Sequence, residues 1–333
     1  MNRFEGKTIL VTGACGTVGT ELVRQLVNSP AGKIICIDNN ETELFFLLEE
    51  YKHVEKVTGH LADIRDIEAL KLRMANVDIV LHSAALKHVG LCEDSPNQAV
   101  QTNILGTQNV IDAALYHDVE RVIFTSSDKA VNPTNVMGTS KLMGERLMTA
   151  AAESSGGKTV FASTRFGNVL GSRGSVVPLF QRQIEQGGPI TLTDKRMTRF
   201  IMTLEEAVEL VLSSVWLAKG GEVMVTKMPI AKIEDIAIVM KGMLGNSSVE
   251  ITEIGAKPGE KLYEELMNDE EVRRTWEVGD FFVILSAFAN EGNESYQSMK
   301  GLPQPNRPYN SSLEDTMSNE EVRIYFKERN ILH

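Results

Sequence analysis

Residues 8–19 read TILVTGACGTVG, a short apolar run that is followed at once by three glycines. The run predicts a buried strand, and the glycines predict a tight turn that opens a helix. Glycine at 13, 16 and 19 lets backbone N–H groups approach a pyrophosphate closely, and a helix N-terminus favours negative charge. We interpret this turn as a dinucleotide-binding element formed by Gly13, Gly16, Thr17, Val18 and Gly19.

A second apolar run, residues 33–37, ends at Asp38, roughly 20 residues beyond the glycine turn. A carboxylate at this spacing is placed to accept hydrogen bonds from an adenosine ribose. Asn39 and Asn40 follow it, and no arginine stands close by in the sequence to neutralise a 2′-phosphate, so the pattern favours NAD over NADP. Other residues are expected near the adenosine or where the cofactor lies close to the protein backbone. They are Asn39, Asp63, Ile64, Ala84 and Ala85.

Apolar runs alternate with helical periodicity through the first half of the chain. Strands are predicted at residues 8–11, 33–37, 55–58, 78–82, 121–125 and 159–163, and helices at 17–28, 42–53, 66–75, 95–117 and 137–154. Continuous hydrophobicity within the strands indicates burial on both faces, which is typical of a parallel sheet. We expect an α/β fold, a Rossmann-like doubly wound parallel sheet with a smaller, partly discontinuous α/β substrate-binding region. The NAD-binding domain is predicted to comprise residues 1–165 and 201–225, and the substrate-binding region residues 166–200 and 226–333.

The overall composition excludes several classes of function. The 333 residues include 34 Lys and Arg against 45 Asp and Glu, a formal net charge of -11. This balance argues against nucleic-acid binding, which needs clustered positive charge. Three cysteines without metal-ligand spacing predict neither a disulfide framework nor a metal site. No apolar stretch approaches the ~20 residues of a membrane helix, so we expect a cytoplasmic protein without a membrane contact.

The fifth predicted strand and the helix after it carry the residues expected to do chemistry. Ser126 and Ser127 follow the strand, and Met137 stands four residues before Lys141. Together with the TGxxGxxG spacing and Asn103, these residues resemble an extended short-chain dehydrogenase/reductase. That family usually carries Tyr-x-x-x-Lys, whose tyrosine is the acid/base for a sugar hydroxyl and whose lysine holds the nicotinamide ribose. Here a methionine replaces the tyrosine.

Met137 cannot transfer a proton, which leaves two hypotheses. In the first, the chain is a catalytically inactive dinucleotide sensor, and Met137 only fills the core. In the second, the acid–base work has moved to Asp128 and Lys129, at the carboxyl end of the fifth strand, where open α/β sheets place their chemistry. An adjacent carboxylate and ammonium are costly to bury there without a purpose, and they supply a general acid and a general base in one loop.

Four segments make the resemblance more specific. They are residues 84–89 (AALKHV), 127–138 (SDKAVNPTNVMG), 165–176 (RFGNVLGSRGSV) and 257–262 (KPGEKL). Together they resemble the UDP-N-acetylglucosamine 4,6-dehydratases of bacterial polysaccharide biosynthesis, over essentially the whole chain. The methionine-containing branch of that family is more similar to this chain and includes enzymes that retain the C5 configuration. The resemblance is to its short, soluble forms and implies a homo-oligomer.

The resemblance implies a redox-neutral reaction on a UDP-sugar with tightly held NAD. Hydride leaves C4 for NAD, water is eliminated across C5 and C6, and the hydride returns to C6 to give a 4-keto-6-deoxy sugar. By the same resemblance Asp128 protonates the departing C6 hydroxyl, Lys129 removes the C5 proton, Ser127 bonds the C4 oxygen, and Lys141 binds the nicotinamide ribose. The acceptor of the C4 hydroxyl proton stays open between Asp128 and a water molecule.

An acidic chain must concentrate positive groups locally to hold two phosphates, and arginine grips phosphate oxygens bidentately. The residues expected at the substrate are Lys87, His88, Asn168, Arg173, Ser175, Val176, Arg196, Arg199 and Glu260. Those expected at the cofactor also include Lys87, Asn103 and Lys141. A lysine is a base at neutral pH only if its pKa is lowered, and the neighbouring Asp128 acts against that. A nucleotide-sugar 4-epimerase and a non-catalytic NAD-sensing protein remain as alternatives, and the sequence alone does not fix the C5 configuration.

Overall fold

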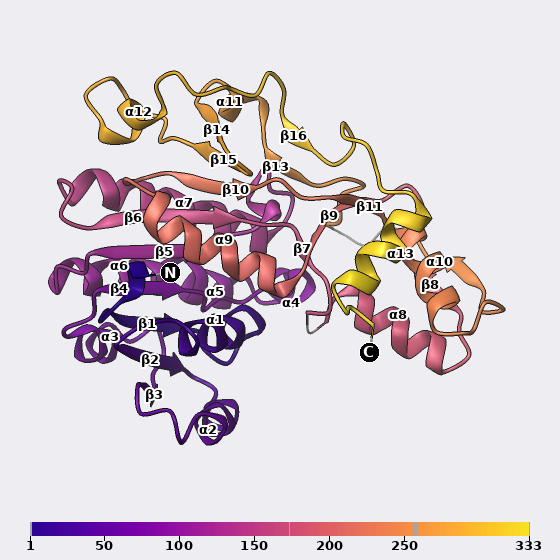
Figure 1. Ribbon diagram of the computed structural model, residues 1–333, viewed down its shortest axis with the longest axis horizontal. Helices are drawn as coiled ribbons and strands as arrows, with labels where there is room; N and C mark the ends of the chain where they lie inside the picture. The colour runs from indigo at the N-terminus through magenta and orange to yellow at the C-terminus, as the bar shows by residue number, and fades with distance from the viewer. Residues whose placement is uncertain (1, 173, 256–258, 333) are drawn as a thin grey trace.

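A nine-stranded sheet forms the centre of the molecule (Figure 1). The computed structural model describes residues 2–172, 174–255 and 259–332. The strands lie in the order β14-β15-β10-β6-β5-β4-β1-β2-β3. Their bounds are β1 Thr8–Thr12, β2 Lys33–Asp38, β3 Val57–Leu61, β4 Ile79–His82, β5 Arg121–Thr125, β6 Val160–Arg165, β10 Val223–Thr226, β14 Thr275–Val278 and β15 Phe281–Ile284.

The strands from β3 to β10 are parallel to their neighbours, whereas β15 is antiparallel to β10 and β14 is antiparallel to β15. The parallel strand order reverses at β1, which has β2 on one side and β4 on the other. Ligands of open α/β sheets bind outside the carboxyl ends of the strands at such a reversal. The predicted doubly wound parallel α/β sheet is confirmed.

Helices cover both faces of this sheet because buried side chains alternate along its strands. Ile9 and Val11 of β1 lie in one apolar cluster with residues of α1, α2 and α9, whereas Leu10 lies in another with residues of α3, α6 and α7. The helices have the bounds α1 Thr17–Val27, α2 Glu41–Glu50, α3 Ile67–Met74, α6 Gly106–Tyr116, α7 Val136–Ser154 and α9 Leu204–Leu217.

The segment before α6 differs from the prediction of one helix over 95–117. The chain forms α4 Val89–Asp94, α5 Pro96–Ala99 and then a π-helical segment, Val100–Leu105, before α6 begins. Asn103 lies inside the π-helical segment, and its side chain bonds the backbone N–H and C=O of Leu86 and the hydroxyl of Ser140. Single π turns in helices often mark functional sites, and this one ties the loop after β4 to α7.

The smaller region lies at one end of the large sheet (Figure 1) and has its own apolar core. Its elements are β7 Asn168–Val169, α8 Val176–Glu185, β8 Ile190–Leu192, β9 Thr198–Met202, β11 Ile230–Lys232, α10 Ile233–Met243, β12 Ile251–Glu253 and α13 Asn319–Glu328. The remaining elements of the C-terminal part are β13 Glu265–Met267, α11 Asp269–Val272, α12 Glu294–Met299 and β16 Tyr309–Asn310. Among the described residues, no helix has the length and apolar character needed to cross a membrane.

The C-terminal part serves both regions. The sequence assigns 226–333 to substrate binding, yet β14 and β15 of this stretch extend the large sheet at its edge. A buried ion cluster fastens it there. The guanidinium of Arg165, at the end of β6, donates to Glu145 of α7 at 2.6 Å and to Glu271 of α11 at 2.8 Å. The catalytic-helix candidate α7 is thereby anchored to the C-terminal part.

Candidate active site

The glycine turn between β1 and α1 has no room for side chains. Gly13 has a φ of +65°, and a Cβ there would come within 2.6 Å of the Cα of Ala84. A Cβ on Gly19 would collide with the carbonyl oxygen of Gly13. The Thr17 hydroxyl is buried and has no hydrogen-bond partner among the described residues. Close-packed backbone, a helix N-terminus and an unsatisfied hydroxyl fit the pyrophosphate of a dinucleotide.

A cavity of about 470 Å³ lies beside this turn, at the carboxyl ends of β2 and β3. Asp38 fixes its rim by accepting hydrogen bonds from the backbone N–H of Cys15 at 3.0 Å and of Asn40 at 2.9 Å. The residues predicted at the adenosine that line this cavity are Asp38, Asn39, Asp63, Ile64, Ala84 and Ala85.

Arg65 also lines this cavity, although the sequence shows no arginine near Asp38. Its guanidinium is held by Asp63, whose carboxylate lies 2.6 Å from it. This bidentate pairing lowers the pKa of Asp63 to about 2. The arginine is therefore already engaged by a carboxylate, and the NAD preference stays a prediction.

A second cavity, of about 530 Å³, adjoins the first and shares part of its wall. It lies where β1, β4 and β5 end, at the reversal of strand order. Its lining residues are Gly16, Thr17, Val18, Gly19, Ser83, Ala85, Leu86, Lys87, His88, Thr125, Ser126, Ser127, Asp128, Lys129, Met137, Lys141, Phe166, Gly167, Asn168, Val169, Ser172 and Ser175. The predicted catalytic residues therefore share one cavity with the glycine turn.

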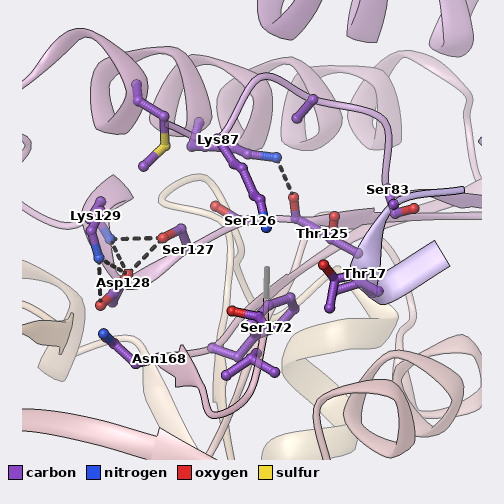
Figure 2. Close-up of a pocket in the computed structure, with 18 of the residues that line it drawn as sticks. Thr17, Ser83, Lys87, Thr125, Ser126, Ser127, Asp128, Lys129, Asn168 and Ser172 are labelled. Atoms are coloured by element: carbon purple, nitrogen blue, oxygen red, sulfur yellow. Dashed lines mark hydrogen bonds and ion pairs between the residues drawn. The ribbon is translucent and has the colours of Figure 1, made fainter. Parts of the chain in front are cut away.

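Ser127, Asp128 and Lys129 form a hydrogen-bonded group on the wall of this cavity (Figure 2). The Ser127 hydroxyl donates to the Asp128 carboxylate at 2.6 Å, and the Lys129 ammonium donates to it at 3.1 Å. A short 3₁₀ turn, Asp128–Ala130, directly after β5 brings the three side chains together. Asp128 is 2% exposed, whereas the Lys129 side chain is 28% exposed.

A second carboxylate, Glu264, also faces Lys129, at 3.5 Å. Desolvation favours the neutral amine, but Asp128 and Glu264 outweigh it and raise the pKa of Lys129 above its ordinary value, against the opposing charge of Arg199. The lowered pKa that a lysine base requires is therefore not found in the resting cluster. A proton has to leave Lys129 before it can act as a base.

Met137 and Lys141 begin α7 and line the same cavity. Met137 is 4% exposed and packs with Cys92 and Ala99. The Lys141 amine donates to the carbonyl oxygen of Thr125 at 2.8 Å, and desolvation lowers its pKa to about 8, although Glu145 and Cys92 oppose the shift. Lys141 is thus the buried amine whose charge the protein disfavours most clearly.

The residues predicted at the substrate fall into two groups. Lys87, His88, Asn168 and Ser175 line the cavity. The Oδ1 of Asn168 and the hydroxyl of Ser175 are buried without a hydrogen-bond partner in the described part of the chain. Such unsatisfied polar atoms suit a polar ligand.

The other predicted substrate residues do not line the cavity, as far as the structure describes the chain. Arg196 is exposed and paired with Asp194 at 2.7 Å, and Arg199 is buried in β9. Val176 begins α8 beside Ser175. Glu260 lies in the described part of the loop before β13, outside the lining, and Arg173 lies outside the described residues. Their contacts with a substrate stay predictions.

Sequence reasoning missed the buried partners behind the cavity. Ser126 donates to Glu145 at 2.6 Å, and Glu264 stands between Lys129 and Arg199. Glu145 lies four residues after Lys141, a helical spacing that could have indicated it. Nothing in the sequence around Glu264 distinguishes it from a surface carboxylate.

A family model described as "Polysaccharide biosynthesis protein" matches residues 9–286, which include the glycine turn and the whole wall of the second cavity. The chain belongs to this polysaccharide biosynthesis protein family. The Rossmann-type fold is that of solved nucleotide-sugar dehydratases and epimerases.

Several relatives match this chain over most of their length. The "Uncharacterized membrane protein MJ1061" of Methanocaldococcus jannaschii is 45% identical over 98% of this chain and 97% of that protein. The "UDP-N-acetylglucosamine 4,6-dehydratase (inverting)" of Campylobacter jejuni is 39% identical over 90% of this chain and 89% of its own. A "UDP-glucose 4-epimerase" of Rickettsia rickettsii is 39% identical over 84% and 83%.

Among solved structures, Pen from Bacillus thuringiensis has a TM-score of 0.91 and 39% sequence identity, covering 99% of this chain and 100% of that chain. The correspondence therefore extends over the large sheet and the smaller region alike. The predicted cytoplasmic location and self-association stay predictions.

Proposed function

We propose that this protein is a UDP-N-acetylglucosamine 4,6-dehydratase, which forms a UDP-4-keto-6-deoxy-N-acetylhexosamine with loss of water. The observation that carries the proposal is the contact between Asp128 and Lys129 on the wall of a cavity that adjoins the glycine turn. Elimination needs one proton removed from carbon and one delivered to the departing hydroxyl, so an acid and a base must face the same substrate. The Campylobacter jejuni relative of that name supports the substrate class.

NAD is the cofactor that the residues fit. The backbone of the glycine turn packs too closely to accept a Cβ at Gly13 or Gly19, and the buried Thr17 hydroxyl has no partner in the described structure. Asp38 would hold the adenosine ribose, and Lys141 the nicotinamide ribose. When bound, NAD would supply a hydride acceptor for C4 and a hydride donor for C6.

Ser127 and Asp128 would handle the oxygen-bound protons. The Ser127 hydroxyl already donates to the Asp128 carboxylate at 2.6 Å, so a C4 hydroxyl bonded to Ser127 has a path for its proton to Asp128. Asp128, now a carboxylic acid, would protonate the C6 hydroxyl as it departs as water. The Met137 thioether has no proton to give and would provide only an apolar wall.

Lys129 would remove the C5 proton and later return a proton to that carbon. Its side chain lines the cavity and is more exposed than the side chains of Asp128 and Glu264, which it contacts. The polar atoms of Asn168 and Ser175 that lack partners among the described residues would bind the UDP-sugar, together with Lys87 and His88 at the same cavity.

The test is incubation of the purified protein with UDP-N-acetylglucosamine in deuterated water, followed by proton NMR. We expect a 4-keto-6-deoxy product without added reductant, deuterium at C5, and retention of the C5 configuration. Inversion, which the name of the Campylobacter jejuni relative carries, would refute the stereochemical part. Failure to convert any of a set of UDP-hexoses would refute the proposal itself.

A nucleotide-sugar 4-epimerase is the second candidate, because the Rickettsia rickettsii relative bears such a name. Epimerisation would leave the mass of the sugar unchanged and invert C4, which the same spectra distinguish from dehydration. Met137 argues against it, because an epimerase relies on the proton transfer that the tyrosine at this position performs in the resembling family.

A further inference from the structure

Glu264 is a buried carboxylate that the steps above leave without a role. Its side chain is 4% exposed, and it does not belong to the described lining of the cavity. Its Oε1 lies 3.5 Å from the Lys129 amine and 3.5 Å from Nε of Arg199. Glu264 therefore contacts Lys129 from outside the described lining of the cavity.

The backbone of Glu264 is fixed by hydrogen bonds to a distant segment. Its N–H donates to the Ser311 hydroxyl at 2.9 Å, and its carbonyl accepts from the Ser311 N–H at 2.9 Å. The Ser311 hydroxyl in turn lies 2.8 Å from that of Thr198, in β9 next to Arg199. Three segments thus converge to hold this carboxylate beside the amine.

The cluster balances two carboxylates, Asp128 and Glu264, against two cations, Lys129 and Arg199. Desolvation raises the pKa of Glu264, and the negative charge of Asp128 raises it further. The positive charges of Lys129, Arg199 and Lys261 lower this pKa, but the net shift is still upward. Glu264 thus accepts a proton more readily than an ordinary glutamate. Lys129 lies between the two carboxylates and has a proton to transfer.

We propose that Glu264 receives the proton that Lys129 must give up before it acts as the base at C5, a role that rests on the proposed dehydratase function. An N–H bond of the ammonium breaks and an O–H bond forms on Glu264, so a neutral amine faces the cavity. Asp128 stays ionised to take the C4 proton. Glu264 is a positioning residue, because it acts through Lys129.

Asp128 is closer to the Lys129 amine, at 3.1 Å against 3.5 Å for Glu264, but the proposed division of roles favours Glu264 for this step. Asp128 is already the partner of Ser127 and lines the cavity, whereas Glu264 does not belong to the described lining. The lysine stem is flexible, so its amine can move the short distance to Glu264 without a backbone change. When Glu264 becomes neutral, Arg199 keeps its hydrogen bonds to the carbonyl groups of residues 198, 261 and 262.

The pH profile of ketosugar formation by the NAD-loaded enzyme tests this role. In the wild type the proton only changes place inside the cluster, so the rate should be flat between about pH 6 and pH 7.5, below the pKa of about 8 of Lys141. In Glu264→Gln the proton must go to solvent, so the rate should rise about tenfold per pH unit until Lys129 titrates. Glu264→Asp keeps a carboxyl group and should restore the flat profile.

Glu265→Gln is the matched control, because Glu265 is the next residue and pairs with Lys261 at 3.3 Å instead of with Lys129. Its profile should stay flat. A merely structural role for Glu264 predicts a lower rate at every pH with no new slope, and that outcome would overturn the inference.

Infrared spectroscopy supplies a readout that needs no turnover. As the pH is lowered, the infrared band of a protonated carboxyl group should appear in the wild-type protein at a higher pH than an ordinary glutamate requires. This band should be missing in Glu264→Gln and present in Glu265→Gln. An identical band in Glu264→Gln would overturn the inference. A wild-type enzyme that forms no ketosugar would instead overturn the proposed function, and the role of Glu264 in it.

Discussion

Replacing Lys141 by methionine should change how the stability of the protein depends on pH. Lys141 is 6% exposed, and desolvation lowers the pKa of its amine from the ordinary 10.5 to about 8. Between these pKa values the unfolded chain still holds a proton that the folded chain has released. The contribution of Lys141 to the free energy of unfolding therefore rises with pH, by about 1.4 kcal/mol per unit.

The methionine variant lacks this rise. The stability difference between the two proteins should therefore shift in favour of the wild type by about 2 kcal/mol between about pH 7 and pH 9.5, and by about 3 kcal/mol over the whole interval. The lost hydrogen bond to the Thr125 carbonyl adds only a constant offset. Urea unfolding of nucleotide-free protein, followed by tryptophan fluorescence at both pH values, measures the shift.

Lys158→Met is the control, because Lys158 lies exposed beyond the end of α7. Its stability difference from the wild type should be the same at both pH values. If the stability difference between Lys141→Met and the wild type is also the same at both pH values, the protein does not disfavour the charge of this amine. The reasoning from burial would then fail.

Other substitutions test the acid–base pair, the glycine turn and the ion cluster. Asp128→Asn and Lys129→Ala should each lower ketosugar formation at least about 10²-fold, with NAD content unchanged; wild-type rates by NMR would refute the assigned roles. Gly19→Ala pushes a Cβ into the Gly13 carbonyl, so calorimetry should give a lower Tm and titration a weaker affinity for NAD. An undiminished affinity for NAD would contradict the assignment of the glycine turn. Arg165→Met removes the guanidinium that two buried glutamates share and should cost about 3–5 kcal/mol in urea unfolding; a loss below about 1 kcal/mol would count against the ion cluster.

The sequence predicted the centre of the sheet well, because its strands are continuous apolar runs with clear endings. The fifth strand was placed at 121–125, the bounds of β5 in the structure. The third was placed at 55–58, whereas β3 spans Val57–Leu61. That strand lies at the edge of the sheet, and all of its residues are half-buried or exposed, so its hydrophobic signal is weak.

Pairings that depend on distant contacts were not predictable in the same way. The antiparallel strands β14 and β15 join the sheet beside β10, a partner that no local pattern specifies. The π-helical turn around Asn103 likewise follows from hydrogen bonds to Leu86 and Ser140, on other elements. Local periodicity predicts which segments form elements, but tertiary contacts decide how they bend and pair.

The same division holds for the site. Asp128 and Lys129 could be singled out because they are adjacent and follow a strand that ends at the ligand-binding edge. The role of Glu264 depends on hydrogen bonds to Ser311 and a neighbouring Arg199, both remote in sequence. The charge of Arg199 suggested a phosphate ligand, which stays a prediction, and the sequence did not indicate that its guanidinium donates to backbone carbonyls.

The replacement of a phenol by Met137 is consistent with this charged cluster in physical terms. Met137 gives the cavity that Asp128 and Lys129 share an apolar side chain in place of a hydroxyl, and loss of water on substrate binding would penalise every charge left in the cluster. Transfer of a proton from Lys129 to Glu264 removes two of those charges at once, so substrate that displaces solvent favours the neutral base. The methionine would thus help the amine to become reactive, although it carries no proton itself.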